Sequence, residues 1–151
     1  MNRRAALFML LATTAISMVP RHVLAATLPK LVVFRNPGCG CCEGWVRHMK
    51  NAGFEVSMED DPNLNARRAS LKIPDELASC HIAMADGYAF EGHIPASDIV
   101  KFLNIPPQGA IGLVVPGMPM GSPGMGAPVS GRRYEVLLLA ANAAPVIYAS
   151  H

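Results

Sequence analysis

Apolar residues recur with two different periods after residue 30, and this pattern predicts an alternation of strands and helices. The run from Leu31 to Phe34 is apolar throughout and rich in β-branched residues, which is typical of a buried strand. After a turn at Asn36-Pro37-Gly38, helical spacing appears and ends before Gly53, in the residues Trp45, Val46, Met49 and Ala52. Alternation from Phe54 to Met58 predicts a second strand. A strand–helix–strand unit of this length implies two parallel strands joined by a right-handed crossover.

The next segment predicts a hairpin between two helices. Residues 63–71 form a short helical pattern that ends at Ile73-Pro74. The Asp86-Gly87 pair between the apolar runs 80–85 and 88–94 is a strong hairpin signal. Pro95 begins another helix, with Ile99, Phe102 and Leu103 on one face. A β-α-β half followed by a β-β-α half is the plan of a thioredoxin-like fold, so the predicted class is α/β, with a mixed sheet flanked by helices.

The C-terminal third differs in composition. Residues 106–128 are rich in glycine and proline and contain three methionines, which predicts a loop, and a short apolar piece lies within it at 111–115. Residues 134–140 and 146–148 predict two closing strands around a turn at 142–145. We find no internal repeat in the sequence.

The first residues have the plan of an export signal. A short basic start, Asn2-Arg3-Arg4, precedes an apolar run from Ala5 to Met18 and a small-residue cleavage point at Val23-Leu24-Ala25. The apolar run is short for a membrane span, although an uncleaved anchor is the alternative. We therefore predict a signal peptide at 1–25, a single periplasmic domain at 26–151, and no membrane attachment after cleavage. The net charge of +2, without a basic run, argues against a nucleic-acid partner.

Three of the four cysteines, Cys39, Cys41 and Cys42, lie where the first strand turns into the first helix. The positive end of a helix dipole favours thiolates at such a turn. Cys39 and Cys42 have the Cys-x-x-Cys spacing of a thiol–disulfide oxidoreductase, but Cys41 would compete for every mixed disulfide, and three close thiolates suit a soft metal. Cys80 begins the next predicted strand, directly after the loop 74–79, which faces this turn in a thioredoxin-like fold. A structural disulfide framework suits this spacing badly, because Cys41 and Cys42 are adjacent.

The identity of the metal depends on the other donors. Four-sulfur sites point to zinc or iron–sulfur clusters, whereas clustered thiolates suit copper(I). Thioether sulfur also suits copper(I), so the loop methionines favour copper over zinc. The predicted accessory ligands are His81, His93, Met118, Met120 and Met125. Cys80 and His81 are neighbours on a predicted strand and would point to opposite faces, and His48 is expected to be solvated.

Several motifs together resemble a known family, the CopG-type copper-resistance proteins, which are secreted proteins catalogued as a domain of unknown function. The resemblance rests on the segments Cys39–Trp45, Ala52–Val56, Ser79–His81 and Asp86–Ala96, and on the Gly- and Met-rich segment 116–125. It implies a periplasmic thioredoxin-like domain that binds copper(I), as a multi-copper cluster, through Cys39, Cys41, Cys42 and Cys80. Other periplasmic copper-handling proteins are the expected partners.

Three hypotheses remain open from the sequence. The favoured one is a copper-binding protein of copper resistance that cycles the redox state of its metal; binding is favoured over catalysis, and no catalytic residue is assigned. The second is a thiol–disulfide oxidoreductase that uses Cys39 and Cys42. The third is a structural domain stabilised by zinc.

Overall fold

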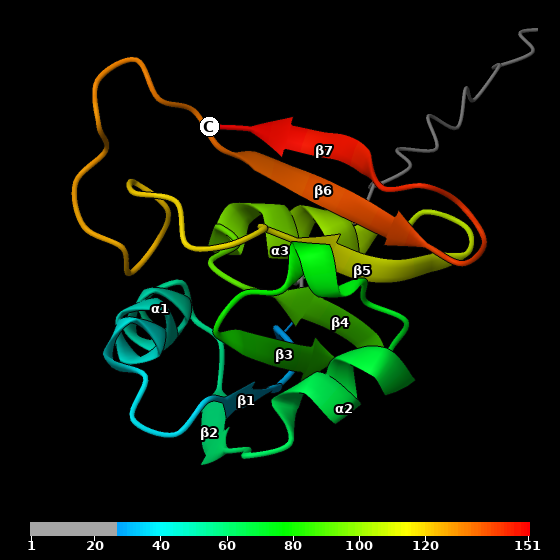
Figure 1. Ribbon diagram of the computed structural model, residues 1–151, viewed down its shortest axis with the longest axis horizontal. Coiled ribbons are helices and arrows are strands. Elements are labelled where there is room, and N and C mark those ends of the chain that lie inside the picture. Colours follow the sequence, from blue (N-terminus) through cyan, green and yellow to red (C-terminus); the bar gives the residue numbers. More distant parts are fainter. Residues whose placement is uncertain (1–26) are drawn as a thin grey trace, which may run out of the picture.

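The computed structural model of the protein describes residues 27–151, so the predicted signal peptide lies outside the described residues. Within this part of the chain, no helix is long and apolar enough to cross a membrane. The elements, shown in Figure 1, are β1 (Leu31–Arg35), α1 (Gly40–Asn51), β2 (Val56–Asp60), α2 (Leu64–Ser70), the 3-10 helix η1 (Asp75–Leu77), β3 (His81–Ala85), β4 (Tyr88–Glu91), α3 (Ala96–Asn104), β5 (Ala110–Val114), β6 (Glu135–Ala140) and β7 (Val146–Ser150).

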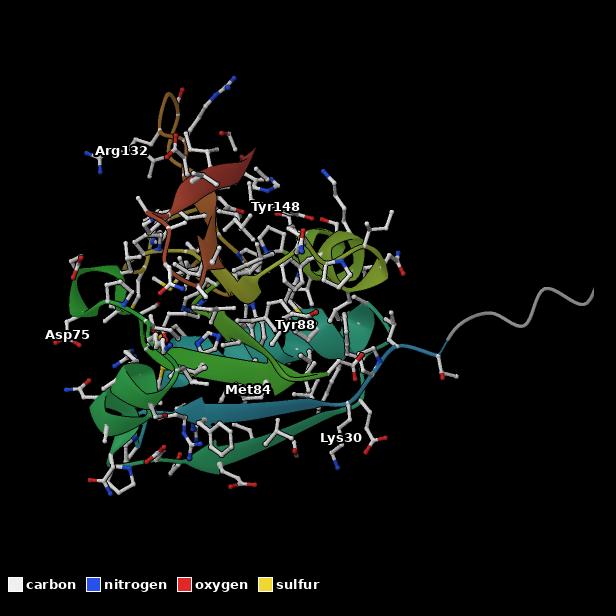
Figure 2. All side chains as sticks on the ribbon, turned by 90° about the vertical axis from the view of Figure 1, so that its right-hand side faces the viewer. Lys30, Asp75, Met84, Tyr88, Arg132 and Tyr148 are labelled. Carbon is white, nitrogen blue, oxygen red and sulfur yellow. A yellow bond between two sulfur atoms is a disulfide. The ribbon has the colours of Figure 1, made fainter. Side chains whose placement is uncertain are left out.

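The strands form one mixed sheet in the order β2-β1-β3-β4-β5-β6-β7. The pairs β1–β2 and β4–β5 are parallel, and the other neighbours are antiparallel. Figure 2 shows Lys30, which precedes β1, and Tyr148 on β7 near opposite ends of this order. The predicted α/β class and mixed sheet are confirmed, and the order β2-β1-β3-β4 is compatible with the thioredoxin-like plan.

Helices cover both faces of the sheet because strand side chains alternate between the faces. On one face the helices α1 and α3 pack against the sheet, with Trp45, Phe90 and Phe102 fully buried. On the other face, α2 and the segment after it pack in a smaller cluster around Leu64 and Ile82. The cysteine turn at the start of α1 therefore lies on the face that carries the larger core.

The predicted hairpin is confirmed, and one further strand joins the sheet. Asp86 and Gly87 both have positive φ, 48° and 82°, as a two-residue hairpin turn of type I′ requires. The apolar piece at 111–115 is the strand β5, which pairs with β4 inside the sheet rather than lying in a loop. At Gly112 the backbone comes so close to the Ala89 carbonyl that a Cβ atom would overlap it. The remaining segment, residues 115–134, contains no helix or strand, and we call it the glycine-rich loop.

Candidate metal centre

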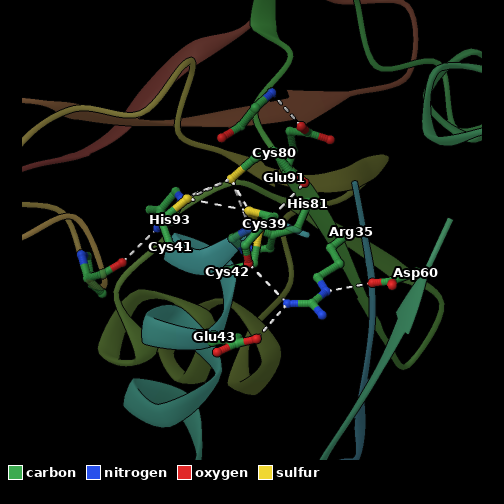
Figure 3. The surroundings of a disulfide bond; sticks show 12 residues. Arg35, Cys39, Cys41, Cys42, Glu43, Asp60, Cys80, His81, Glu91 and His93 are labelled. Carbon is green, nitrogen blue, oxygen red and sulfur yellow. Dashed lines mark hydrogen bonds and ion pairs between the residues drawn. A yellow bond between two sulfur atoms is a disulfide. The ribbon is translucent and has the colours of Figure 1, made fainter. Parts of the chain in front are cut away.

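The four cysteine sulfurs lie together at the start of α1, as Figure 3 shows. Cys39 is the N-cap residue of α1, and Cys41 and Cys42 lie in its first turn. Cys80, immediately before β3, comes from the other side: its Sγ lies 3.5 Å from the Sγ of Cys41 and 3.4 Å from that of Cys42. Cys41 Sγ is 3.4 Å from Cys39 Sγ. The strand-to-helix turn and the facing loop thus bring together every cysteine of the chain.

Two of these sulfurs form a disulfide, between Cys39 and Cys42, whereas Cys41 and Cys80 are free. The bridge spans three residues and links no distant parts of the domain, so it is not a structural framework. Cysteine binds a metal as a thiolate, and a sulfur in a disulfide bond is not a thiolate. The structure therefore represents the oxidised form, and a four-thiolate site requires two-electron reduction of this bond.

Burial keeps the Cys80 thiol protonated in the metal-free protein. It raises the pKa of Cys80 to about 12, and the hydrogen bond with Cys41 acts in the same direction. A metal that binds Cys80 must displace this proton, so metal binding at the site releases protons.

His93 has the orientation of a metal ligand. Its ring Nδ1 lies 2.8 Å from the carbonyl oxygen of Pro123, and its Nε2 lies 3.2 Å from Cys80 Sγ. Donation from Nδ1–H to the carbonyl fixes the tautomer and leaves the Nε2 lone pair directed at the sulfur. Burial lowers the pKa of His93, which keeps the ring neutral and able to bind a metal.

His81 lies on the same side of Cys80, contrary to the expectation of opposite faces. Its Nδ1 is 3.6 Å from Cys80 Sγ, because Cys80 precedes β3 and does not follow the alternation of the strand. The His81 ring is fully buried against Trp45, and burial lowers its pKa to about 3. Its Nε2 has no hydrogen-bond partner. Candidate ligand atoms of Cys80, His81 and His93 all lie within 4.8 Å of one another.

Arg35 fixes the cysteine turn from the β1 side. Its guanidinium donates to the Cys39 carbonyl at 3.0 Å, to Glu43 at 3.1 Å and to Asp60 at 2.7 Å. Glu43 lies in the first turn of α1, where a carboxylate complements the helix dipole. The same guanidinium thereby ties the turn to both β2 and α1.

The glycine-rich loop rests directly on the start of α1. A Cβ atom on Gly124 would lie 2.6 Å from the backbone nitrogen of Trp45, so only glycine allows this approach. Within the loop, Met118 and Met120 are about half exposed, at 53% and 49%, and Met125 is half-buried. The loop thus supplies the carbonyl that holds His93, and its three methionines remain at least partly exposed.

The expectation that His48 is solvated is wrong. It is half-buried, and its Nε2 accepts a hydrogen bond at 3.1 Å from the backbone N–H of Ala96, the first residue of α3. It therefore satisfies an N–H group at the helix start, where intrahelical partners are lacking. Trp45 packs in the core as predicted, and its Nε1–H also donates to the Ile94 carbonyl.

A buried ion pair between Arg68 and Glu91 lies beside Cys80 and was not predicted from the sequence. Each of the two residues stands out in the sequence as a charge at a position expected to be buried. Arg68 follows Leu64 by one helical turn and so shares the buried face of α2, and Glu91 is the charged last residue of the otherwise mainly apolar strand β4. Charges of opposite sign at two buried positions indicate a pair, but the sequence alone does not say that these two meet.

The fold and the donor set define a class of protein: an α/β domain that gathers thiols and neutral imidazoles into a cluster suited to a soft metal. Comparison with known proteins supports this. Two solved structures, named "Copper resistance protein copG", forms 1 and 2, match over 82% of this chain and 98% of theirs, with 35% and 34% identity and a TM-score of 0.73 for each. The chain belongs to this copper-resistance family, as its motifs suggested.

A family described as "Protein of unknown function, DUF411" matches residues 77–125. This range contains Cys80, both site histidines and about the first half of the glycine-rich loop, but not the cysteine turn. Among curated proteins, none matches the chain.

Proposed function

We propose that this protein is a periplasmic copper(I)-binding protein of copper resistance, which holds copper through Cys39, Cys41, Cys42 and Cys80. The observation that carries the proposal is the convergence of the four sulfurs, of which Cys80 comes from a separate loop. Thiolates are the ligands that copper(I) prefers, and sulfurs this close are able to bridge neighbouring ions, which favours a multinuclear site. Thiolates also bind zinc, but zinc is the less favoured metal because the glycine-rich loop carries three methionines, whose thioether sulfurs suit copper(I).

The remaining donors have accessory roles in this proposal. His93 and His81 bind from the side of Cys80, and Met118, Met120 and Met125 offer neutral sulfurs from the loop. In an oxidising compartment, bound metal protects the thiolates from oxidation. The proposal includes export by a cleaved signal peptide at 1–25, a mature domain at 26–151, and exchange of copper with other periplasmic copper-handling proteins.

Redox cycling of the bound copper is the further part of the proposal. The disulfide supports it, because the site exists in an oxidised form in which two of the four sulfurs are not available as thiolates. Two electrons and two protons convert this bond into two thiols. The number of copper ions held therefore depends on the oxidation state of the protein.

The test is a copper(I) titration of the reduced protein under anaerobic conditions, with a chromogenic chelator as competitor. Cys41→Ser and Cys80→Ser are each expected to bind fewer copper ions than the unmodified protein. Met58→Leu is the control, because Met58 lies on β2, packs toward the core and is not part of the site. Unchanged stoichiometry in Cys80→Ser would show that the four sulfurs do not act together.

A second candidate function has a specific observation in its favour. The Cys39–Cys42 disulfide lies at the start of a helix, as in thiol–disulfide oxidoreductases. Such an enzyme should still reduce or oxidise a model disulfide after Cys41→Ser and should lose this activity after Cys39→Ser. The copper proposal predicts instead that both substitutions reduce metal binding.

A further inference from the structure

A buried ion pair joins α2 to β4 on the face of the sheet opposite α1. Arg68 and Glu91 have exposed fractions of 2% and 0%. The Nε and Nη2 atoms of Arg68 donate to the same carboxylate oxygen of Glu91, at 3.1 and 3.0 Å. A buried ion pair adds little net stability, because the loss of hydration offsets the attraction between the charges. Its presence calls for a reason other than stability.

The pair binds both backbone polar groups of Ser79. The same oxygen of Glu91 accepts a hydrogen bond from the Ser79 N–H at 2.6 Å, and the Arg68 guanidinium donates to the Ser79 carbonyl. The Ser79 hydroxyl in turn donates to the carbonyl of Gly117 in the glycine-rich loop. A Cβ atom on Gly92 would lie 2.8 Å from the Ser79 Cβ. Ser79 is therefore held by its N–H, its carbonyl, its hydroxyl and its packing.

Ser79 is the residue immediately before Cys80, which supplies the one sulfur of the cluster that does not belong to the α1 turn. A change in the backbone at Ser79 would swing the Cys80 side chain away from Cys41 and Cys42, which now lie 3.5 and 3.4 Å away, sulfur to sulfur. Three sulfurs have their spacing set by one helical turn. The position of the fourth depends on the loop that the ion pair fixes.

We propose that Arg68 and Glu91 are positioning residues that hold Cys80 against the cysteine turn, so that four sulfurs bind the same group of metal ions. This inference rests on the proposed copper function. Residues that orient metal ligands typically contribute about 10–100-fold to metal affinity. The pair should therefore affect copper affinity more than it affects folding.

The central variant is the double substitution Arg68→Met/Glu91→Leu. Removing both charges leaves no unpaired buried charge, so the protein should fold with stability close to that of the unmodified protein. The half-buried Ser79 backbone then loses both partners. We expect the affinity for copper(I), measured by chelator competition well below the unfolding temperature, to fall by about 10–100-fold. Arg67→Ala is the matched control. Arg67 is the residue next to Arg68, but its guanidinium pairs with Asp61 and does not contact Ser79.

A second readout needs no metal. In the oxidised, metal-free protein, Cys41 and Cys80 are the free thiols, and alkylation at each is measured by peptide mass spectrometry. Cys80 is 8% exposed. In the double variant its alkylation rate should rise severalfold relative to that of Cys41, which serves as the internal reference.

Arg68→Lys covers the case in which the double variant does not fold. Lysine keeps the positive charge beside Glu91 but lacks the planar fork that also reaches the Ser79 carbonyl. Weaker copper binding and faster alkylation of Cys80 would again support the proposal. Copper competition and alkylation equal to those of the unmodified protein, in a folded variant, would overturn it. If the unmodified protein itself binds no copper, the proposed function fails, and alkylation alone decides whether the pair positions Cys80.

Discussion

The contact between the glycine-rich loop and α1 brings two glycines together, Gly124 of the loop and Gly44 of the helix, and neither leaves room for a Cβ atom. An added Cβ atom on Gly124 would lie 2.6 Å from the Trp45 nitrogen, 2.9 Å from the Cys41 carbonyl oxygen and 3.0 Å from the Gly44 carbonyl carbon. All three are backbone atoms of α1, which cannot rotate away as a side chain can. In Gly124→Ala we therefore expect the loop to move off the helix and to withdraw the Pro123 carbonyl from His93.

The structure supplies a control for the backbone strain of this substitution. Gly131, in the same loop, also has positive φ, 74° against 88° at Gly124, but an added Cβ atom would meet nothing within 4 Å. Positive φ costs an alanine about 1–2 kcal/mol, partly offset by a gain of about 0.4–1 kcal/mol from the stiffer unfolded chain. Overpacking adds about 1–3 kcal/mol, at Gly124 alone. One kcal/mol corresponds to about 3–5 °C in a domain of this size.

Thermal unfolding of the two alanine variants, followed by circular dichroism, measures this difference. The midpoint of Gly124→Ala should lie below that of Gly131→Ala by about 3–15 °C, from the overpacking cost and its conversion to temperature. NMR of the histidine rings provides the structural readout, because the His93 Nδ1–H should exchange faster with solvent only in Gly124→Ala. Equal midpoints and equal exchange in the two variants would refute the close contact as the reason for glycine.

Three further predictions concern the site and its support. Thiol titration of the unfolded, metal-free protein should find two free thiols before reduction and four after, because Cys39 and Cys42 are bridged; four before reduction would contradict this. The free energy of unfolding should fall by about 2 kcal/mol between pH 7 and pH 5, because the pKa of His81 is about 3 in the folded protein and 6.5 in the unfolded chain, which therefore takes up the proton first. Urea unfolding at several pH values measures this, and the reasoning is wrong if His81→Gln shows the same pH dependence of its midpoint as the unmodified protein. Trp45→Phe leaves the Ile94 carbonyl without its donor and should cost about 1–3 kcal/mol in urea unfolding, a loss that a midpoint equal to the unmodified one would rule out.

Local patterns in the sequence were sufficient to predict most elements between residues 31 and 104. The strand at Leu31, the helix that ends before Gly53 and the Asp86-Gly87 hairpin all depend on periodicity and turn chemistry within a few residues. The meeting of Cys80 with the cysteine turn followed from the fold plan, since that plan places the loop before the third strand against the first helix. A boundary shift of one residue at Cys80 was enough to change which side of the cluster His81 occupies.

Long-range pairings could not be predicted in this way. Strand β5 carries Gly112 and lies between segments rich in glycine and proline, so its short apolar run does not reveal that it pairs with β4. The partnership of Arg68 with Glu91 spans 23 residues and depends on how α2 packs on the sheet. The role of the Pro123 carbonyl cannot be predicted from side-chain chemistry, because every residue has a backbone carbonyl group.

The order of these contacts along the chain has a consequence for the biogenesis of the protein. All four cysteines have been synthesised once residue 80 is added, but the carbonyls of Gly117 and Pro123 that hold Ser79 and His93 come about forty residues later. Contacts between distant residues form late, since loop closure must precede them. The complete candidate metal centre is therefore a product of the finished fold, and under the proposed copper function a loaded centre marks a chain whose C-terminal third has already packed on the rest of the domain.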